Sequence, residues 1–428
     1  MTKGDDKKQG KKPFRLQEHI EWIAMAWVLA LTVKCFVVEA YQIPSGSMAP
    51  TLYGRHYRVD CPQCGEGFNV RGGDGDFATS HICPVCEKEG SSTGRVRLRG
   101  GDRILVAKDL YWLAPPKRWD VFVFKSPEEG HQTQNFVKRL VGMPGETLTL
   151  KDGQVFVDGV IVHKPERVQK QLWQDVYDSR HSAAATEYWR SGGEWEVKEG
   201  KLLLAQESEL WQTVEYERPI LDYYSYNGRE GENVVGDVLV GGHVKLEGDR
   251  ASFAAGVWRD DETIKAVFTP TIDTLTVELR RNEDLVRSMR SIITSPREFD
   301  FSLAVVDGTQ KIKVNGVYVI ENVEKVAVDD TPLYTKSSRA FFSGVRGKMF
   351  VSDVEIKRDV YYRSSLIRPD YLVQGPFVHE IGEGEYLGLG DNSPISSDGR
   401  VWGVVPAENV LGKAFVLFWP PSRVKAVF

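Results

Sequence analysis

The longest apolar run of the chain lies close to its N-terminus, at residues 20–40, and reads IEWIAMAWVLALTVKCFVVEA. A helix of this length rises about 31 Å, which matches a bilayer core of roughly 30 Å. Lys34 interrupts the run near one end, where its charged group can extend to the lipid headgroups, and Glu21 and Glu39 fall at the two interfaces. The pattern predicts one transmembrane helix.

Two other interpretations of this run stay open. A buried helix of a globular domain has a similar pattern, and the small residues around Val38-Glu39-Ala40 resemble the cleavage site of a removable signal peptide. The preceding residues 1–19 are polar and basic. Because Lys and Arg that flank a span stay in the cytoplasm, an uncleaved helix leaves the N-terminus there and the rest of the chain outside. We expect a single-pass protein of the inner or plasma membrane.

After this run, short β-branched and aromatic segments alternate with Gly, Pro and Asp-Gly turns, as in DRILVAKDLYW, DVFVFKSPEEG and NFVKRLVGMPGETLTLKDGQVFVDG. Such segments predict an antiparallel sheet. Residues 165–182 differ, because Val168, Leu172 and Val176 are spaced by four, which predicts a helix.

A second strand-rich region spans residues 186–362. Its short alternating segments recur at regular spacing, and Asn315-Gly316 in KVNGVYV suits the two-residue turn of a hairpin. Many such strands predict a β-sandwich, and the region is long enough to be a domain of its own. Residues 363–428 return to the mixed texture of the first strands. The fold class is therefore mainly β.

Composition and charge change this picture little. The chain has 428 residues and a formal net charge of −5 at pH 7, so no basic field indicates a nucleic-acid partner. Its length favours two or three structural units over one.

Four of the five cysteines form two C-x-x-C pairs, CPQC (Cys61, Cys64) and CPVC (Cys83, Cys86), within residues 54–94; the fifth is in the apolar run. Two such pairs at this spacing predict a structural zinc site of four thiolates. Two disulfides are the alternative, which an oxidising compartment favours. Four thiolates leave no open position on the metal, so we expect no cofactor for catalysis.

The stretch IPSGSMAPTL at residues 43–52 places two serines in a turn directly after the apolar run. A serine hydroxyl is a weak nucleophile unless a base removes its proton. None of the eight histidines lies in a recognisable triad setting, but a lysine whose pKa is lowered by burial can also serve. Lys138 shares one face of its expected strand with Phe136 and Leu140, so its side of the sheet can be dry.

Three segments occur in order behind the apolar run: QIPSGSMAPTL, NFVKRLVGMPGE and LGLGDNSPISSDGRVWGVVP. Together they resemble the type I signal peptidases, membrane-bound serine proteases that remove leader peptides from exported proteins. The resemblance implies an antiparallel-sheet catalytic domain made of residues 41–53, 95–185 and 363–428. It implies that residues 54–94, a zinc-ribbon-like segment, and residues 186–362 are insertions.

The resemblance also implies roles for individual residues. Ser47 matches the nucleophile and Lys138 the general base, while Ser45 matches a serine that stabilises the oxyanion together with the backbone N–H of Ser47. Ser396 matches a serine that holds the amine of Lys138.

Asp398 and Arg400 match a structural ion pair beside the site. The last segment departs from the family pattern, because Ser393 stands where Arg is usual, followed by Pro394, and Gly399 stands where Ser is usual. These changes concern the shape of the loop more than its chemistry.

The expected substrates are pre-proteins with small residues before the cleavage site, presented at the surface of a lipid bilayer, with the protein export machinery as a further partner. Phe415, Phe418 and Trp419 near the C-terminus fit either the membrane interface or a core strand. The sandwich loosely resembles concanavalin-like or laminin-G-like domains, which implies a glycan or protein ligand, or a purely structural spacer.

Two alternatives to a signal peptidase stay open. One is another Ser–Lys processing protease that shares the catalytic fold; the apolar run and the lack of a DNA-binding helix pair disfavour the self-cleaving repressors. The other is an inactive membrane-anchored scaffold whose sandwich and zinc-ribbon-like segment bind partners.

Overall fold

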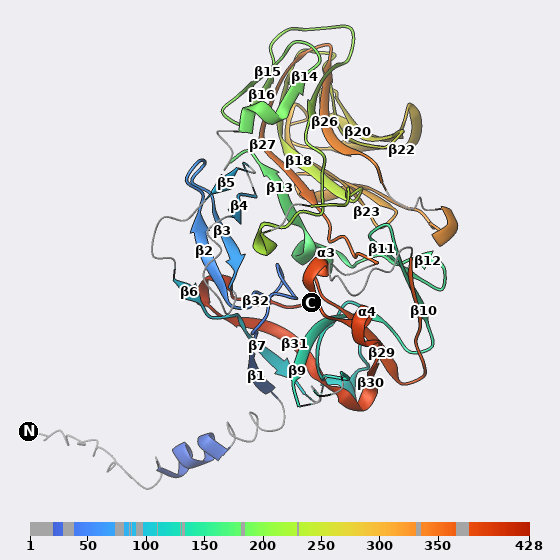
Figure 1. Cartoon of the computed structure of the whole chain (residues 1–428). Coiled ribbons are helices and arrows are strands. Elements are labelled where there is room, and N and C mark those ends of the chain that lie inside the picture. Colours follow the sequence, from blue (N-terminus) through green and yellow to red (C-terminus); the bar gives the residue numbers. More distant parts are fainter. Residues whose placement is uncertain are drawn as a thin grey trace, which may run out of the picture.

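The computed structural model describes residues 20–28, 38–72, 81–84, 86, 88–90, 97–108, 110–128, 130, 133–180, 185–228, 231–330, 335–364 and 376–428. Figure 1 shows a lower body, a two-layered upper body, and a helical segment apart from both. The mainly β class predicted from the sequence is confirmed.

The lower body is built on an antiparallel sheet, as the sequence predicts. Its strand order is β1-β7-β31-β8-β9-β29-β30. Its strands are β1 (Val38–Gln42), β7 (Arg103–Ala107), β8 (Val121–Lys125), β9 (Asn135–Gly142), β29 (Glu385–Leu389), β30 (Val405–Pro406), β31 (Val410–Trp419) and β32 (Lys425–Ala426), which pairs with β31. The central β9, which carries Lys138, lies between β8 and β29.

A smaller sheet, β12-β11-β10-β28, adjoins it. Its strands are β10 (Thr147–Lys151), β11 (Gln154–Val157), β12 (Val160–Ile161) and β28 (Phe377–Glu380). Leu148, Leu150 and Val155 of this sheet share one buried apolar cluster with Leu387 and Leu389 of β29. The two sheets of the lower body are therefore joined by a common core.

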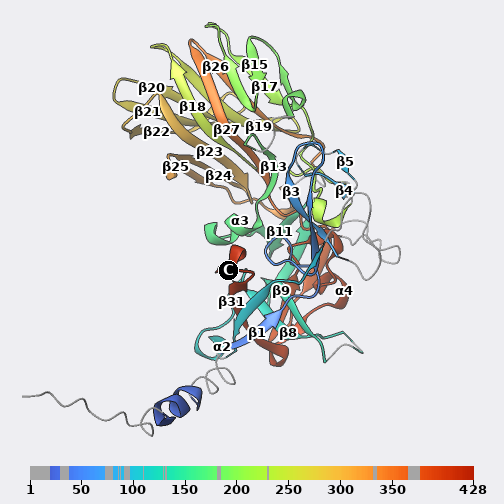
Figure 2. The same ribbon diagram turned by 90° about the vertical axis from the view of Figure 1, so that its left-hand side faces the viewer.

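The upper body is a sandwich of two antiparallel sheets, whose layers Figure 2 shows from the side. One has the order β15-β16-β27-β18-β23-β24-β25 and the other β14-β17-β26-β19-β20-β21-β22. Aromatic and branched side chains of both, such as Phe253, Phe301 and Phe342, form one continuous buried cluster. The hairpin at Asn315-Gly316 is confirmed, since both residues have positive φ, 48° and 77°.

The strands of the sandwich are β14 (Trp189–Ser191), β15 (Trp195–Lys198), β16 (Lys201–Leu204), β17 (Gln212–Tyr216), β18 (Val238–Glu247), β19 (Ser252–Arg259), β20 (Glu262–Pro270), β21 (Thr274–Arg281), β22 (Asp284–Ile292), β23 (Glu298–Val306), β24 (Thr309–Val314), β25 (Val317–Val323), β26 (Ser338–Val345) and β27 (Lys348–Arg358).

The helix predicted at residues 165–182 is wrong in its second half. Helix α3 (Glu166–Leu172) ends at Leu172, and strand β13 (Gln174–Asp178) follows and pairs with β27 of the sandwich. The apolar spacing continues to Val176, but pairing with β27 and burial of Tyr177 in the core of the sandwich override the local helical preference. The other helices are short: α2 (Leu110–Leu113) and α4 (Gly399–Trp402), with 3-10 turns η1 (Ala185–Tyr188), η2 (Ser225–Asn227), η3 (Val328–Asp330), η4 (Ser393–Ile395), η5 (Ala407–Asn409) and η6 (Pro421–Arg423).

Residues 54–94, which we call the cysteine segment, contain β2 (His56–Asp60), β3 (Gly67–Arg71), β4 (His81–Ile82) and β5 (Glu89–Gly90); β6 (Leu98–Arg99) pairs with β2. The segment lies against the sandwich side of the molecule, because the hydroxyl of Tyr188 donates to Cys86 O at 2.6 Å and that of Tyr223 to Ile82 O at 2.7 Å.

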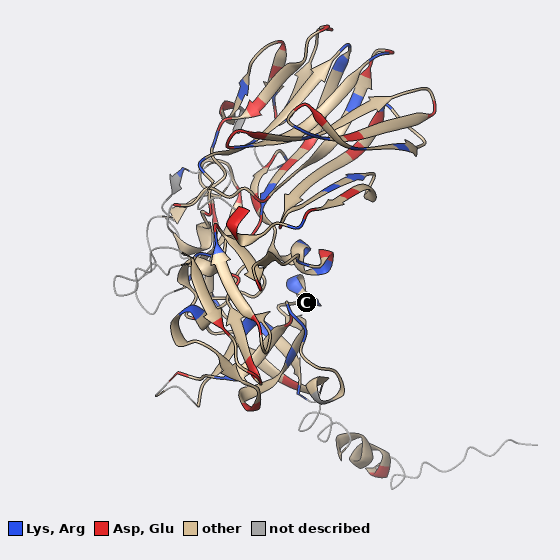
Figure 3. Ribbon diagram, turned by 90° about the vertical axis from the view of Figure 1, so that its right-hand side faces the viewer, with Lys and Arg blue, Asp and Glu red and all other residues tan. Residues whose placement is uncertain are grey.

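Within the predicted membrane span, residues 20–28 are helical and residues 38–40 belong to strand β1; the residues between them lie outside the described part of the chain. A search of the described helices finds none that is both long and apolar enough to cross a bilayer. The transmembrane helix therefore stays a prediction, with its C-terminal end before Val38. Figure 3 shows both signs of charge spread over the lower and upper bodies.

Candidate active site

The loop of residues 43–53, which we call the nucleophile loop, connects β1 to the cysteine segment. Met48, Ala49 and Leu52 are buried and hold it against the lower sheet, while Leu52 N donates to Met48 O at 2.9 Å. Ser45 is exposed and Ser47 half-buried. The glycine, alanine and proline residues of this stretch thus fix a turn in which the two serine side chains point toward solvent.

Lys138 meets this loop from strand β9. Its Nζ lies 2.8 Å from Ser47 Oγ, although 91 residues separate the two in sequence. The lysine is only 5% exposed, and burial lowers its pKa from 10.5 to about 8; Asp398 opposes this shift and Arg400 adds to it. The amine can therefore lose its proton near neutral pH, which a general base must do.

Ser45 stands on the open side of the pair. Its Oγ is 3.5 Å from Ser47 Oγ. The backbone N–H of Ser47 donates no hydrogen bond within the described part of the chain. A hydroxyl and an N–H both remain available beside the nucleophile, as an oxyanion site needs.

Asp398 and Arg400 form a fully buried ion pair, with Arg400 Nη2 and Asp398 Oδ2 at 2.7 Å. Asp398 also accepts from Gly390 N and from Arg400 N at the start of α4. The pair thereby connects α4 to Gly390, where an added Cβ would lie 2.5 Å from Ser47 O. The predicted ion pair beside the site is present.

Ser393, which replaces the usual arginine, closes the loop in another way. Its Oγ accepts from Arg363 N at 2.9 Å and from Arg400 Nη1 at 3.0 Å. Arg400 therefore remains in register with Asp398 despite the changed residues.

Ser396 is buried beside these groups, and its Oγ makes no hydrogen bond among the described residues. It lies next to Gly390, where an added Cβ would approach Ser396 Oγ to 2.1 Å. The structure thus brings Ser396 to the site but shows no bond from it to Lys138.

Comparison with known proteins shows the family of the chain. The family described as signal peptidase, peptidase S26, matches residues 82–209 and 308–419, more than half of the chain. The chain belongs to the signal peptidase family S26. The family match includes Lys138, Ser396, Asp398 and Arg400, whereas Ser47 lies outside the matched residues.

Curated relatives in this family carry the same assignment. A signal peptidase I of Leptolyngbya laminosa is 27% identical over 42% of this chain and 75% of its own length. A probable signal peptidase I of Synechocystis is 41% identical over 38% of this chain and 61% of its own length. A signal peptidase I of Bacillus licheniformis is 24% identical over 37% of this chain and 60% of its own length. The chain thus spans about two thirds of these relatives, and the comparisons support signal-peptide removal by a serine endopeptidase.

Solved structures resemble the chain only weakly. A carbohydrate-binding module from Bacillus subtilis has a TM-score of 0.29 at 11% identity and covers 40% of this chain and 95% of its own. A galectin-like protein from the same species has a TM-score of 0.32 at 11% identity, with 44% and 98% covered. Similarity at this level assigns no ligand to the sandwich.

Several residues around this candidate site were not predicted from the sequence. Asn392, inside the GDN of the third motif, donates through Nδ2 to Gly46 O at 3.0 Å and through N to Ser47 O at 3.0 Å. Arg139, next to Lys138, forms a buried bidentate pair with Asp391 at 2.7 Å. Their motif positions were a usable signal. Tyr226 and Asn227 of the insertion lie in no motif, so no such sequence signal marks them.

The four cysteines of the cysteine segment come together. Their sulfur atoms all lie within 4.8 Å of one another, with 3.5 Å between Cys61 Sγ and Cys86 Sγ and 3.6 Å between Cys64 Sγ and Cys83 Sγ. All four are free thiols in this arrangement. Sulfur atoms bound at 2.3 Å to one tetrahedral Zn²⁺ would be about 3.8 Å apart, so the residues fit this metal.

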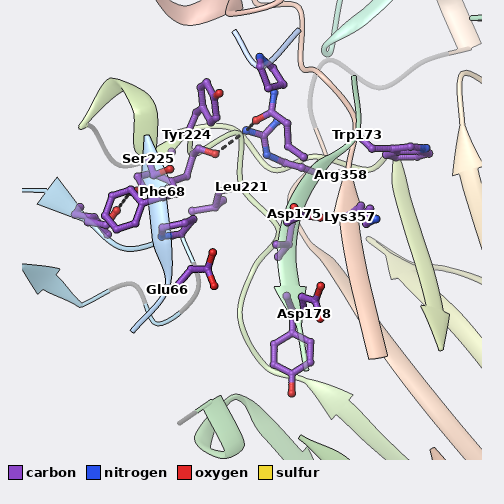
Figure 4. Close-up of a pocket in the computed structure, with 18 of the residues that line it drawn as sticks. Glu66, Phe68, Trp173, Asp175, Asp178, Leu221, Tyr224, Ser225, Lys357 and Arg358 are labelled. Carbon is purple, nitrogen blue, oxygen red and sulfur yellow. Dashed lines mark hydrogen bonds and ion pairs between the residues drawn. The ribbon is translucent and has the colours of Figure 1, made fainter. Parts of the chain in front are cut away.

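A cavity of about 710 Å³ lies between the cysteine segment and strand β13 (Figure 4). Phe68 and Asp175 line opposite sides, and Tyr53 lines it from the nucleophile loop. In its wall, Arg358 Nη2 donates to Gln174 Oε1 at 2.6 Å, and burial lowers the pKa of Arg358 to about 10. Neither Ser47 nor Lys138 lines this cavity.

Proposed function

We propose that this protein cleaves pre-proteins after their signal peptides with Ser47 as nucleophile and Lys138 as general base. The observation that carries the proposal is the 2.8 Å contact between Ser47 Oγ and an amine whose pKa burial lowers to about 8. A buried lysine without a bonded carboxylate has no evident structural benefit that offsets its desolvation. Its position against a half-buried serine hydroxyl is what acyl transfer requires.

In the first half of the reaction, neutral Lys138 takes the proton of Ser47 Oγ while that oxygen attacks the scissile carbonyl. The carbonyl oxygen becomes an oxyanion, to which Ser45 Oγ and Ser47 N–H donate. Each such donor contributes roughly 2.7–4 kcal/mol in the transition state. Lys138 then gives its proton to the leaving amine, and the signal peptide remains as an ester on Ser47.

In the second half, Lys138 removes a proton from a water that attacks the ester, and Ser47 regains its proton when the signal peptide leaves. The Asp398–Arg400 pair keeps the charge around the amine close to balanced, since its two members act on the pKa of Lys138 in opposite directions. Ser396 has an unused hydroxyl that we propose bonds the amine once substrate excludes water.

We further propose that residues 20–37 anchor the enzyme in the inner or plasma membrane, with the catalytic body outside and substrates arriving from the export machinery. Large apolar side chains of residues 20–28 support this, because Trp22 and Trp27 are 68% and 65% exposed. At the other end of the chain, Trp419 is 49% exposed at the end of β31. We also propose that the substrates have small residues before the cleavage site. The sandwich, in the same proposal, binds a glycan or a protein ligand.

The test is cleavage of a pre-protein by the purified full chain in detergent, with the cut located by mass spectrometry. Ser47→Ala and Lys138→Ala are expected to abolish cleavage, while Ser295→Ala and Lys170→Ala, at exposed positions, keep full activity. Full activity of Lys138→Ala would refute the dyad. Cleavage of soluble proteins at sites away from leader sequences would indicate another Ser–Lys processing protease. The absence of any cleavage would indicate an inactive scaffold.

For the cysteine segment we propose one structural Zn²⁺ held by Cys61, Cys64, Cys83 and Cys86. Bound zinc supplies no catalytic chemistry here, because four thiolates fill its tetrahedron. Elemental analysis is expected to give one zinc per chain, with five thiols titrating after chelation and unfolding, four from this site and one from Cys35. A chain without metal and with only one free thiol, that of Cys35, would show disulfides instead, and Cys61→Ser would then not change the metal content.

A further inference from the structure

The sandwich insertion reaches the nucleophile loop through one turn, η2. Tyr226 of this turn is 1% exposed and stacks on Tyr53 with ring centroids 5.3 Å apart. Its ring also covers Gly46, where an added Cβ would lie 2.3 Å from Tyr226 Cε1. The insertion therefore contacts the residue directly before Ser47.

The next residue, Asn227, continues this contact through Asn392. The two side-chain amides bond each other reciprocally, each Nδ2 donating to the other's Oδ1 at 2.8 Å. Asn392 uses its other amide hydrogen for Gly46 O at 3.0 Å, and it is 1% exposed. Gly46 O also accepts from Ala49 N at 3.1 Å. Because a carbonyl oxygen only accepts, it must face Nδ2 of Asn392 and not Oδ1, which fixes the orientation of the amide, and Oδ1 must find a donor elsewhere. Asn227 provides that donor.

The consequence concerns the peptide group between Gly46 and Ser47. This group is planar, so a hydrogen bond that fixes the direction of Gly46 C=O also fixes the direction of Ser47 N–H. That N–H is the second oxyanion donor in the reaction proposed above, and it has no hydrogen-bond partner in the described part of the chain.

We propose that Asn227 is a positioning residue for catalysis: through Asn392 it holds the Gly46–Ser47 peptide in the orientation that binds the oxyanion. The inference rests on the proposed function and assigns a catalytic role to the sandwich insertion, which supplies Asn227 from outside the catalytic body.

A buried ion pair between the insertion and the catalytic body holds the segment around Asn227 in place. Arg363 Nε bonds Asp222 Oδ2 at 2.7 Å, and Asp222 also accepts from Glu232 N and Asn233 N. The chain around η2 is thereby closed into a loop. Arg363 N in turn bonds Ser393, the neighbour of Asn392, so both partners of the amide pair are fixed relative to each other.

The experiment compares Asn227→Ala, Asn392→Ala and the double variant in the pre-protein assay. Asn227→Ala is expected to lower kcat by about tenfold or more with KM within about twofold, because a donor that is misplaced by a fraction of an ångström weakens only the transition state. Affinity for a peptide boronate, which forms a tetrahedral adduct on serine, is expected to fall by the same factor. The double variant should be no slower than Asn392→Ala alone, since both remove one connected unit.

Asn322→Ala is the matched control, because Asn322 donates to Gln310 Oε1 within the sandwich, away from the loop. It is expected to keep kcat. A normal kcat for folded Asn227→Ala, or losses of the two single variants that multiply in the double variant, would overturn the inference. Ser47→Ala distinguishes a failure of this inference from a failure of the proposed function. If Ser47→Ala stays active, the proposed function itself is wrong.

Discussion

At Lys138, burial and neighbouring charges compete. Burial is the largest influence and lowers the pKa; Asp398 and Asp391 raise it, and Arg400 lowers it. Both aspartates are themselves neutralised, by Arg400 and Arg139, so the desolvation of the amine outweighs their attraction. A base with a pKa of about 8 keeps a fraction on the order of a tenth of its molecules neutral at pH 7.

Ser45 gives the residue-scale prediction. Ser45→Ala removes one oxyanion donor while leaving the nucleophile and base in place, so kcat is expected to fall by about 10²–10³ with KM nearly unchanged. Since Ser45 is exposed, the melting temperature should stay within about 1 °C of the parent protein. Equal losses in kcat for Ser295→Ala, or a change confined to KM, would contradict the oxyanion role.

At the scale of elements, the nucleophile loop depends on a close approach between Gly46 and η2. Gly46→Ala places a methyl group 2.3 Å from the Tyr226 ring, so either the loop or the turn must shift. We expect kcat to fall at least tenfold. Combining it with Tyr226→Ala makes room for the methyl group and should recover part of that loss; a double variant slower than Gly46→Ala would show that the ring contact is not the cause.

The sequence predicted the elements that local patterns encode. Lys138 does lie on a strand with Leu140 buried on the same face, and Phe136 contacts its amine at 5.8 Å from the ring centroid. The Asn315-Gly316 turn followed from the positive φ that both residues tolerate. By contrast, the apolar spacing predicts a helix where strand β13 forms. Its pairing partner β27 lies far away in sequence, and only that pairing decides its conformation.

Asn227 could not be found for a similar reason. It is separated from Asn392 by 165 residues, and no periodicity, charge pattern or motif marks it. Its role depends on a tertiary contact between an insertion and a family motif. The motif residues Ser47 and Lys138, in contrast, were found because the family resemblance names them and not because their spacing implies contact.

On the scale of the whole molecule, a buried charge cluster joins the two bodies. Lys164, after β12, forms ion pairs with Asp307 at 2.5 Å and Asp359 at 2.7 Å, both from the sandwich side. Burial alone lowers the pKa of Lys164, but these charges and Asp237 outweigh it and raise the pKa. Asp237 itself has its pKa raised to about 6 by burial and by its two acidic neighbours.

Removing the lysine from this cluster is expected to be costly. Lys164→Met leaves buried carboxylates without a cation, so the free energy of unfolding should fall by about 3–5 kcal/mol in urea titrations. Lys313→Met, which breaks the more exposed pair with Glu166, should cost at most about 1 kcal/mol. Equal effects of the two variants would mean that the cluster does not hold the bodies together.

The proposed mechanism depends most directly on the protonation of one amine, that of Lys138, and the pH dependence of kcat/KM measures it. Because only neutral Lys138 can accept the proton of Ser47, kcat/KM should rise with pH, reach half of its maximum near pH 8 and level off above it. Lys170→Ala should show the same profile and Lys138→Ala no activity at any pH. A profile that is flat from about pH 6 to pH 10, or one that falls as pH rises through 8, would contradict a lysine base.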